Sequence, residues 1–188
     1  TLLAIAISTN AHDVRVSWVY NGRDDLVSSS SVGLFFRDLP VALRLNDEMT
    51  LRDIFAEVQE QVKNGIKYSC YSYNEIEAPP VDDDDTCILY QRDLRDVGDF
   101  GGLTVEEMEI QQNKAASQTV LDIQILDGEA GLQYVFDYAA SRYEKETMSE
   151  FQNLYKRVIA TIVNANTDGY TFTQLKKDVL GQKGLMKK

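Results

Sequence analysis

The sequence predicts an α/β fold, a mixed β-sheet with helices packed against it. Apolar residues recur at helical spacing in the segments 51–66 and 151–163. The segments 14–20 and 119–126 have the composition or the alternation of strands. Because these helices and strands alternate along the chain, the order favours a sheet covered by helices over an all-β sandwich.

The first half of the chain contains two expected helices and two expected strands. They cover residues 2–9, 14–20, 39–45 and 51–65. Pro40 suits the start of a strand or an edge strand, because proline has no N–H to donate to a neighbour. Thr50 is the expected N-cap of the long helix, with Asp53 as its capping-box partner. This helix is expected to end near Asn64-Gly65.

The second half contains a short strand, a β-hairpin and a final helix. They are expected at 87–91, at 119–126 with 132–138, and from Thr147 onward. Asp127-Gly128 is the expected hairpin turn, and Glu150 the capping-box partner of Thr147. The secondary structure of the segment 103–111 is ambiguous, although the expected order of elements includes a further strand in this region. Beyond Asn166 we expect a polar, lysine-rich tail with little structure.

Composition and charge exclude several function classes. The chain has 188 residues, 44% of them hydrophobic, which is enough for one domain with a core. Its net charge of −11 disfavours binding to nucleic acid or to anionic membranes, because no basic stripe is present to meet phosphates. No apolar run approaches the length of a membrane span. The two cysteines, Cys70 and Cys87, lack metal spacing and are expected as reduced thiols of a cytoplasmic protein.

Several residues resemble catalytic or ligand-binding groups, and each also has a plain structural interpretation. His12 is the only histidine, and we expect an ordinary surface residue in a polar turn. Asp82-Asp83-Asp84-Asp85 lacks the alternating ligands of a calcium loop and is expected to be a solvated acidic loop; whether it binds metal stays open. Cys70 is expected to be at least half-buried, and Gly101-Gly102 lacks the pattern of a phosphate-binding loop.

Arg23 is the more informative candidate. It follows a strand and a glycine, so its guanidinium is expected at a strand end, where cleft residues of α/β folds gather. The alternative is a local ion pair with Asp24, Asp25 or another nearby carboxylate.

Two motifs carry a resemblance to a known family. The first is Trp18-Val19-Tyr20-Asn21-Gly22-Arg23, and the second runs from Val32-Gly33-Leu34-Phe35-Phe36 through Leu39-Pro40 to Leu45. Together they resemble the condensation domains of nonribosomal peptide synthetases, in which a strand ends in Gly-Arg and a glycine- and aromatic-containing segment follows some ten residues later. The resemblance extends over residues 1–165, nearly the whole chain.

The resemblance implies an architecture and a reaction. It implies a fold like that of chloramphenicol acetyltransferase, with two lobes around a tunnel and this chain as the C-terminal half-domain over residues 1–166, followed by a polar tail at 167–188. It implies amide-bond formation between a donor and an acceptor carried on phosphopantetheine arms of peptidyl carrier proteins. The catalytic HHxxxDG motif belongs to the N-terminal lobe and is absent from this sequence, so no catalytic residue is expected here.

The resemblance also assigns roles to particular residues. Arg23 would pair with the aspartate of that motif across the two lobes, a task suited to a guanidinium. The residues implied to line the tunnel are Trp18, Tyr20, Gly33, Phe35 and Phe36. The segment 96–118 would form the tunnel floor. No metal and no directly bound cofactor are expected.

Two other functions remain open at this stage. The first is a non-catalytic interaction or scaffold domain of the same fold. The second is another acyltransferase of the superfamily, including a small stand-alone enzyme that uses His12 as its base. The chain also begins on a helix-like pattern, which implies a cloning boundary or a missing N-terminal partner.

Overall fold

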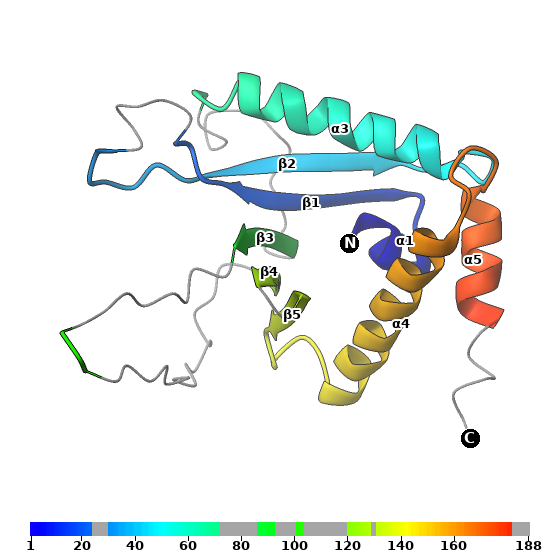
Figure 1. The fold of residues 1–188 in the computed structure, drawn as a ribbon. Helices are drawn as coiled ribbons and strands as arrows, with labels where there is room; N and C mark the ends of the chain where they lie inside the picture. The colour runs from blue at the N-terminus through cyan, green and yellow to red at the C-terminus, as the bar shows by residue number, and fades with distance from the viewer. Residues whose placement is uncertain (24–29, 72–85, 93–100, 104–119, 129–130, 182–188) are drawn as a thin grey trace.

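A five-stranded mixed sheet organises the protein (Figure 1). The computed structural model describes residues 1–23, 30–71, 86–92, 101–103, 120–128 and 131–181. The elements in chain order are α1 (Leu2–Thr9), β1 (Asp13–Tyr20), β2 (Arg37–Arg44), α3 (Leu51–Lys67), β3 (Thr86–Arg92), β4 (Leu121–Gly128), β5 (Gly131–Tyr138), α4 (Lys145–Asn164) and α5 (Phe172–Gly181). The predicted fold class is therefore confirmed.

The sheet has the order β2-β1-β3-β4-β5 and contains both kinds of strand pairing. β1 pairs antiparallel with β2 from Asp13–Arg44 to Tyr20–Arg37, whereas β3 lies parallel to both β1 and β4. β4 and β5 form the predicted hairpin. Asp127 and Gly128 belong to β4 and are not its turn, because both stay in register with β5. The ambiguous segment 103–111 lies almost wholly outside the described residues.

The core lies on one face of this sheet. Val14, Val16, Val41 and Ile123 point to that face and are at most 7% exposed, because alternate residues of a strand share one face. The helices add further members to the same cluster, among them Leu3, Leu51, Ile54, Leu154 and Val158. This packing anchors β1 to the core, and it thereby positions the residues that directly follow the strand.

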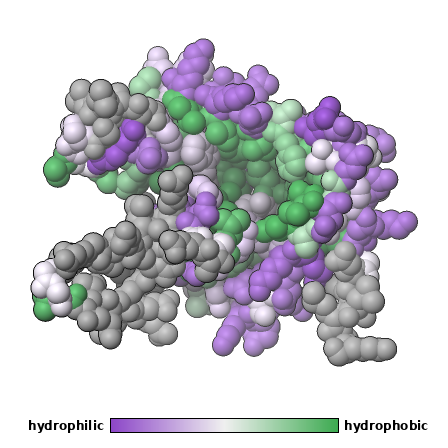
Figure 2. Space-filling view, in the orientation of Figure 1, coloured by the Kyte–Doolittle hydropathy of each residue, from purple (hydrophilic) through white to green (hydrophobic). Residues whose placement is uncertain are grey.

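The predicted capping box of α3 is confirmed, but the apolar side of this helix is buried only in part. The Thr50 hydroxyl accepts from the Asp53 N–H at 3.2 Å, and the Asp53 carboxylate accepts from the Thr50 N–H at 3.1 Å. The helix extends to Lys67, slightly past the expected end. Phe55 remains 41% exposed, and apolar residues gather in a hollow beneath the helix (Figure 2). The described residues therefore leave apolar surface uncovered there.

The outer edge of β2 is closed by a side chain of α3. Gln61 donates from Nε2 to the Ala42 carbonyl at 2.6 Å, and its Oε1 accepts from the Ala42 N–H at 2.9 Å. One amide thus forms the pair of bonds that a neighbouring strand would form. Pro40 lies in the same edge strand, as predicted.

Helix α4 begins earlier than the sequence predicted. It starts at Lys145, with Glu144 as an N-cap that makes no side-chain cap bond, so the predicted capping box of Thr147 and Glu150 is wrong. Glu and Lys residues favour helix, so the residues before Thr147 extend it by about half a turn. The predicted apolar side is confirmed at Leu154 and Val158.

The expectation of a weakly structured tail beyond residue 166 is wrong over 172–181. Helix α5 buries Phe172, Leu175 and Val179 to 1% exposure or less. Their spacing of three and four residues forms one apolar stripe, which the surrounding lysines obscure in the sequence. The segment before it also accepts bonds from the first N–H groups of α3, from Leu51 to the Tyr170 carbonyl and from Arg52 to the Thr167 carbonyl. The C-terminal segment therefore belongs to the core.

Candidate functional site

The residues after β1 form a compact cluster around Arg23. The Arg23 guanidinium donates from Nη1 to the Ser31 carbonyl and from Nη2 to the Gly33 carbonyl, each at 2.9 Å. Its Cζ also lies 4.4 Å from the centroid of the Phe35 ring, a cation–π arrangement. We call Gly22, Arg23, Ser31, Gly33 and Phe35 the Arg23 cluster.

The local sequence explains why the chain folds back at this point. Asn21 accepts from the Arg23 N–H at 3.0 Å, which is the bond of an Asx turn. Gly22 has a φ of 65°, and a Cβ at this position would lie 2.1 Å from the Phe35 carbonyl oxygen. Only glycine permits both the left-handed backbone and this close approach. Gly22 thereby brings the chain of Phe35 against the end of β1.

The segment 32–36 presents apolar side chains to solvent beside this cluster. Val32, Leu34 and Phe36 are 105%, 76% and 48% exposed, whereas Phe35 between the last two is partly buried against Arg23. Exposed apolar residues in a run indicate a surface that a partner covers. We call Val32, Leu34 and Phe36 the exposed apolar strip.

Trp18 and Tyr20 lie next to each other on the core face of β1, with ring centroids 5.9 Å apart. Tyr20 is 8% exposed. The Trp18 indole N–H and the Tyr20 hydroxyl are both shielded from solvent without a hydrogen-bond partner among the described residues. Buried polar atoms without hydrogen bonds are uncommon in proteins, so this pair near the end of β1 is unusual.

The opposite face of the sheet holds a thiol among carboxylates. Cys87 in β3 lies in register between Ser17 and Asp122, and burial raises the pKa of its thiol. Burial also raises the pKa of Asp38, with a further contribution from the negative charge of Asp122. A thiol with a raised pKa is a weak nucleophile at neutral pH. Cys87 and its neighbours therefore lack the features of a catalytic cysteine site.

His12 and Cys70 have the settings of ordinary residues. His12 is an exposed residue, as predicted, with Nδ1 3.1 Å from the Leu45 carbonyl and its ring edge-on to Phe172. Cys70 is exposed, so the expectation that it is at least half-buried is wrong. It follows the end of α3, where the chain leaves the core.

Other predicted features fall outside the described residues. They include Asp82–Asp85, Asp24 and Asp25, and most of the segment 96–118. Gly101 and Gly102 are described, and both have positive φ with open space around them. Among the described elements, no helix combines the length and the apolar character needed to cross a bilayer.

The structure thus brings together three of the six predicted site residues, Arg23, Gly33 and Phe35, in the Arg23 cluster. Trp18 and Tyr20 contact each other on β1, and Phe36 belongs to the exposed apolar strip. Ser31 was missed, because it bonds through its carbonyl and no sequence signal marks such a role.

Comparison with known proteins identifies the family. The sequence profile described as "Condensation domain" matches residues 1–177. A comparison with curated protein sequences finds no match. Among solved structures, the chain is similar to the first condensation domain of the calcium-dependent antibiotic synthetase in complex with a substrate analogue, with 19% identity and a TM-score of 0.68 over 91% of this chain and 38% of that chain.

Two further structures show how widely the fold is used. A holo four-domain nonribosomal peptide synthetase bound to AMP and glycine matches with 13% identity and a TM-score of 0.71, over 92% of this chain and 15% of that one. The X-domain in its complex with OxyB from teicoplanin biosynthesis matches with 17% identity and a TM-score of 0.67, over 93% of this chain and 41% of that one. At such identities these likenesses establish the fold, whereas the profile match over 1–177 establishes the family. This chain belongs to the condensation-domain family.

Proposed function

We propose that this chain acts as the C-terminal lobe of a condensation domain in a nonribosomal peptide synthetase. In this role residues 1–166, together with the packed helix α5, form one wall of a tunnel between two lobes. A separate N-terminal lobe supplies the HHxxxDG histidines. The chain spans 38% of the condensation domain named first above, which is consistent with a partial domain.

The observation that carries the proposal is the Arg23 cluster at the end of β1. Gly22-Arg23 stands at the strand end that the family resemblance indicates, and the segment 31–35 is held against it by two hydrogen bonds and a cation–π contact. The exposed apolar strip and the unpartnered Trp18 and Tyr20 atoms lie on the adjoining parts of the chain. A second lobe placed here would cover the exposed apolar strip.

The proposed reaction assigns few chemical roles to this chain. A carrier-bound amine attacks a carrier-bound thioester, the C–S bond breaks, an amide forms, and the thiol leaves on its phosphopantetheine arm. Arg23 orients the catalytic loop of the other lobe through an aspartate. Trp18, Tyr20, Gly33, Phe35 and Phe36 line the tunnel, and 96–118 forms its floor. The phosphopantetheine arms belong to peptidyl carrier proteins in a cytoplasmic assembly.

The test combines this chain with the region encoded immediately before Thr1. Loaded carrier proteins are incubated with the chain alone or with the longer protein, and condensation product is measured by mass spectrometry. We expect product only with the longer protein, and only if that region encodes HHxxxDG. Product from the isolated chain, or none from a longer protein with an intact motif, would overturn the proposal.

Variants of Arg23 test the orienting role. Arg23→Gln should lower kcat with little change in KM, and Arg23→Lys should restore part of it, because orientation by a charged group acts in the transition state. Lys63→Gln on α3 is the control for the lost positive charge. Equal activity of Arg23→Gln and the unmodified protein would remove Arg23 from this role.

A second candidate function is a non-catalytic interaction domain of the same fold. The likeness to the X-domain favours it, because that X-domain forms a complex with another protein, OxyB. In this case the exposed apolar strip would bind a partner enzyme. Loss of HHxxxDG in the region before Thr1, together with binding that Phe36→Ser weakens, would select this function over the first.

A further inference from the structure

Two exposed asparagines of this chain are each followed by glycine, yet the structure gives them opposite settings. Asn21-Gly22 lies in the turn after β1, and Asn64-Gly65 lies inside α3. An asparagine can lose ammonia when the nitrogen of the next residue attacks its side-chain carbonyl carbon, Cγ. A following glycine favours this reaction, because no Cβ obstructs the attack. The sequence therefore contains two chemically similar sites, and the fold decides which of them reacts.

The turn after β1 positions Asn21 for this attack. Asn21 Oδ1 accepts from the Arg23 N–H at 3.0 Å, so the side chain is folded over the peptide that follows it. The same hydrogen bond stabilises the negative charge that develops on Oδ1 as a nitrogen adds to Cγ. Within the described residues the Gly22 N–H makes no backbone hydrogen bond, and Asn21 is exposed to the solvent that must take the amide proton. Asn21 thus combines an activated carbonyl with an available nitrogen.

Helix α3 protects Asn64 from the same reaction. Asn64 is also exposed, but its carbonyl accepts from the Tyr68 N–H at 3.0 Å, and Gly65, inside the helix, donates its N–H to the preceding turn. A Cβ at Gly65 would lie 3.6 Å from Leu39 Cδ1, so this turn of the helix is packed against β2. Attack by the Gly65 nitrogen requires both residues to leave the helical conformation. Deamidation of Asn64 is therefore limited by local opening of α3.

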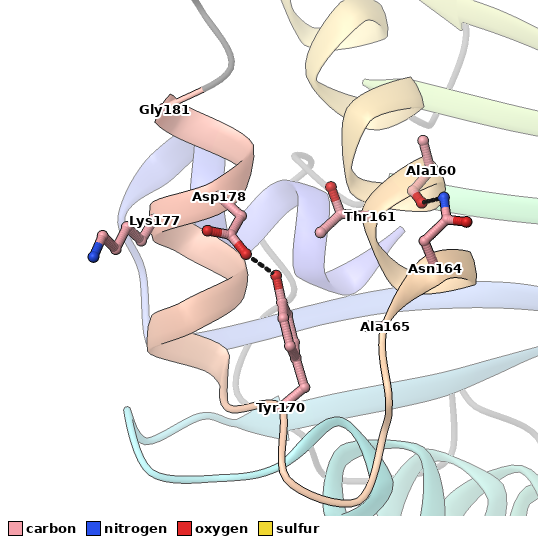
Figure 3. Close-up of a pocket in the computed structure, with 8 residues that line it drawn as sticks. All are labelled: Ala160, Thr161, Asn164, Ala165, Tyr170, Lys177, Asp178 and Gly181. Carbon is pink, nitrogen blue, oxygen red and sulfur yellow. Dashed lines mark hydrogen bonds between the residues drawn. The ribbon is translucent and has the colours of Figure 1, made fainter.

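A third exposed asparagine, Asn164 at the end of α4, has its side chain turned the other way (Figure 3). Its Nδ2 donates to the Ala160 carbonyl at 2.7 Å, so the amide points back along the helix, beside the pocket between α4 and α5. The next residue is Ala165, whose N–H donates to the Ile162 carbonyl at 3.2 Å and whose methyl group hinders attack. The direction of the side chain therefore distinguishes Asn164 from Asn21.

We propose that Asn21 is a site of spontaneous deamidation, and that the isoaspartate formed there opens the Arg23 cluster. The Gly22 nitrogen loses its proton to solvent and attacks Asn21 Cγ. The Cγ–Nδ2 bond breaks, ammonia leaves with a proton from water, and a cyclic succinimide remains. Water then cleaves a bond from the imide nitrogen to a carbonyl carbon: cleavage at Cγ gives aspartate, and cleavage at the main-chain carbonyl gives isoaspartate. The site does not depend on the function proposed above.

Isoaspartate changes the main chain itself, because the chain then runs through Cβ and Cγ and is one atom longer. The turn has no room for such an addition: an atom in the Cβ position of Gly22 would lie 2.1 Å from the Phe35 carbonyl oxygen. The longer link from β1 therefore displaces Gly22 and Arg23. The hydrogen bonds from Arg23 to the Ser31 and Gly33 carbonyls are then lost. Aspartate leaves the main chain unchanged and keeps the Asx turn, because a carboxylate also accepts from an N–H.

The test is incubation of the purified full chain in mildly alkaline buffer, followed by tryptic peptide mapping with mass spectrometry. The tryptic peptides 16–23 and 64–67 each contain one Asn-Gly pair, and an isoaspartate-specific methyltransferase distinguishes the two products. Asn21 should lose ammonia at least about tenfold faster than Asn64, the ratio expected if α3 opens with a free energy of about 1.4 kcal/mol or more. Incubation in urea should bring the two rates together, because the helix is then absent.

Two variants separate the chemistry from its consequence. Asn21→Asp carries the new charge on a normal main chain and should melt within about 2 °C of the unmodified protein. The isoaspartate fraction should melt roughly 4–8 °C lower, the shift for the net loss of the two Arg23 hydrogen bonds. Asn21→Ser has no side-chain amide and should keep its melting temperature through the same incubation.

Each part of the proposal has its own refutation. Equal rates at Asn21 and Asn64 in the folded chain, or no product at Asn21, would overturn the modification site. An isoaspartate fraction that melts like Asn21→Asp, or an equal decline of Asn21→Ser during incubation, would overturn the opening of the Arg23 cluster.

Discussion

Substitution of Leu175 by alanine tests whether α5 is part of the core. Leu175 is 0% exposed and lies between the equally buried Phe172 and Val179 on one stripe of the helix. Leucine-to-alanine changes at buried sites cost about 2.7–5 kcal/mol, because the lost methyl and methylene groups leave a cavity that closes only partly. In a protein of this size, that loss corresponds to a fall in Tm of roughly 6–15 °C.

The matched control is Leu180→Ala in the same helix. Leu180 is 46% exposed, so the same chemical change should alter stability by no more than about 0.5 kcal/mol. The free energy of unfolding of each variant is measured by urea titration, followed by far-ultraviolet circular dichroism. If both variants lose the same amount, or if Leu175→Ala loses less than about 1 kcal/mol, the buried position of α5 is incorrect.

Two further predictions concern the turn and the long helix. Gly22→Ala should destabilise the protein more than Gly101→Ala in thermal melts. Both glycines have a φ near 65°, but only at Gly22 does an added Cβ meet the Phe35 carbonyl oxygen. Equal losses of melting temperature in the two variants would refute the clash. Thr50→Ala should cost about 1 kcal/mol in urea titrations through loss of the helix cap, and an unchanged free energy would show that the cap is dispensable.

The elements that the sequence predicted well are those in which one local pattern decides the structure. Trp18 and its neighbours in β1 combine β-branched and aromatic residues, and Thr50 with Asp53 forms a reciprocal cap, so both were placed correctly. Helix α5 was missed because its stripe has three buried residues among lysines, and its burial depends on contacts far away in the sequence. The Thr147 cap was wrong because a suitable pair of residues also occurs inside helices.

The same distinction applies to the candidate site. The position of Arg23 at a strand end followed from the chain order of a strand, a glycine and an arginine. Its partners did not, because Ser31 and Gly33 contribute backbone carbonyls, and the carbonyl group is common to all residue types.

The amide of Gln61 has a consequence for how this sheet meets other chains. A strand that approached β2 from outside would find the Ala42 N–H and carbonyl already bonded and, at Pro40, no N–H at all. Recruitment of an additional strand, whether from the same polypeptide or from another molecule, is thus directed to the flank of β5. An added strand would therefore extend the sheet at β5 and not at β2.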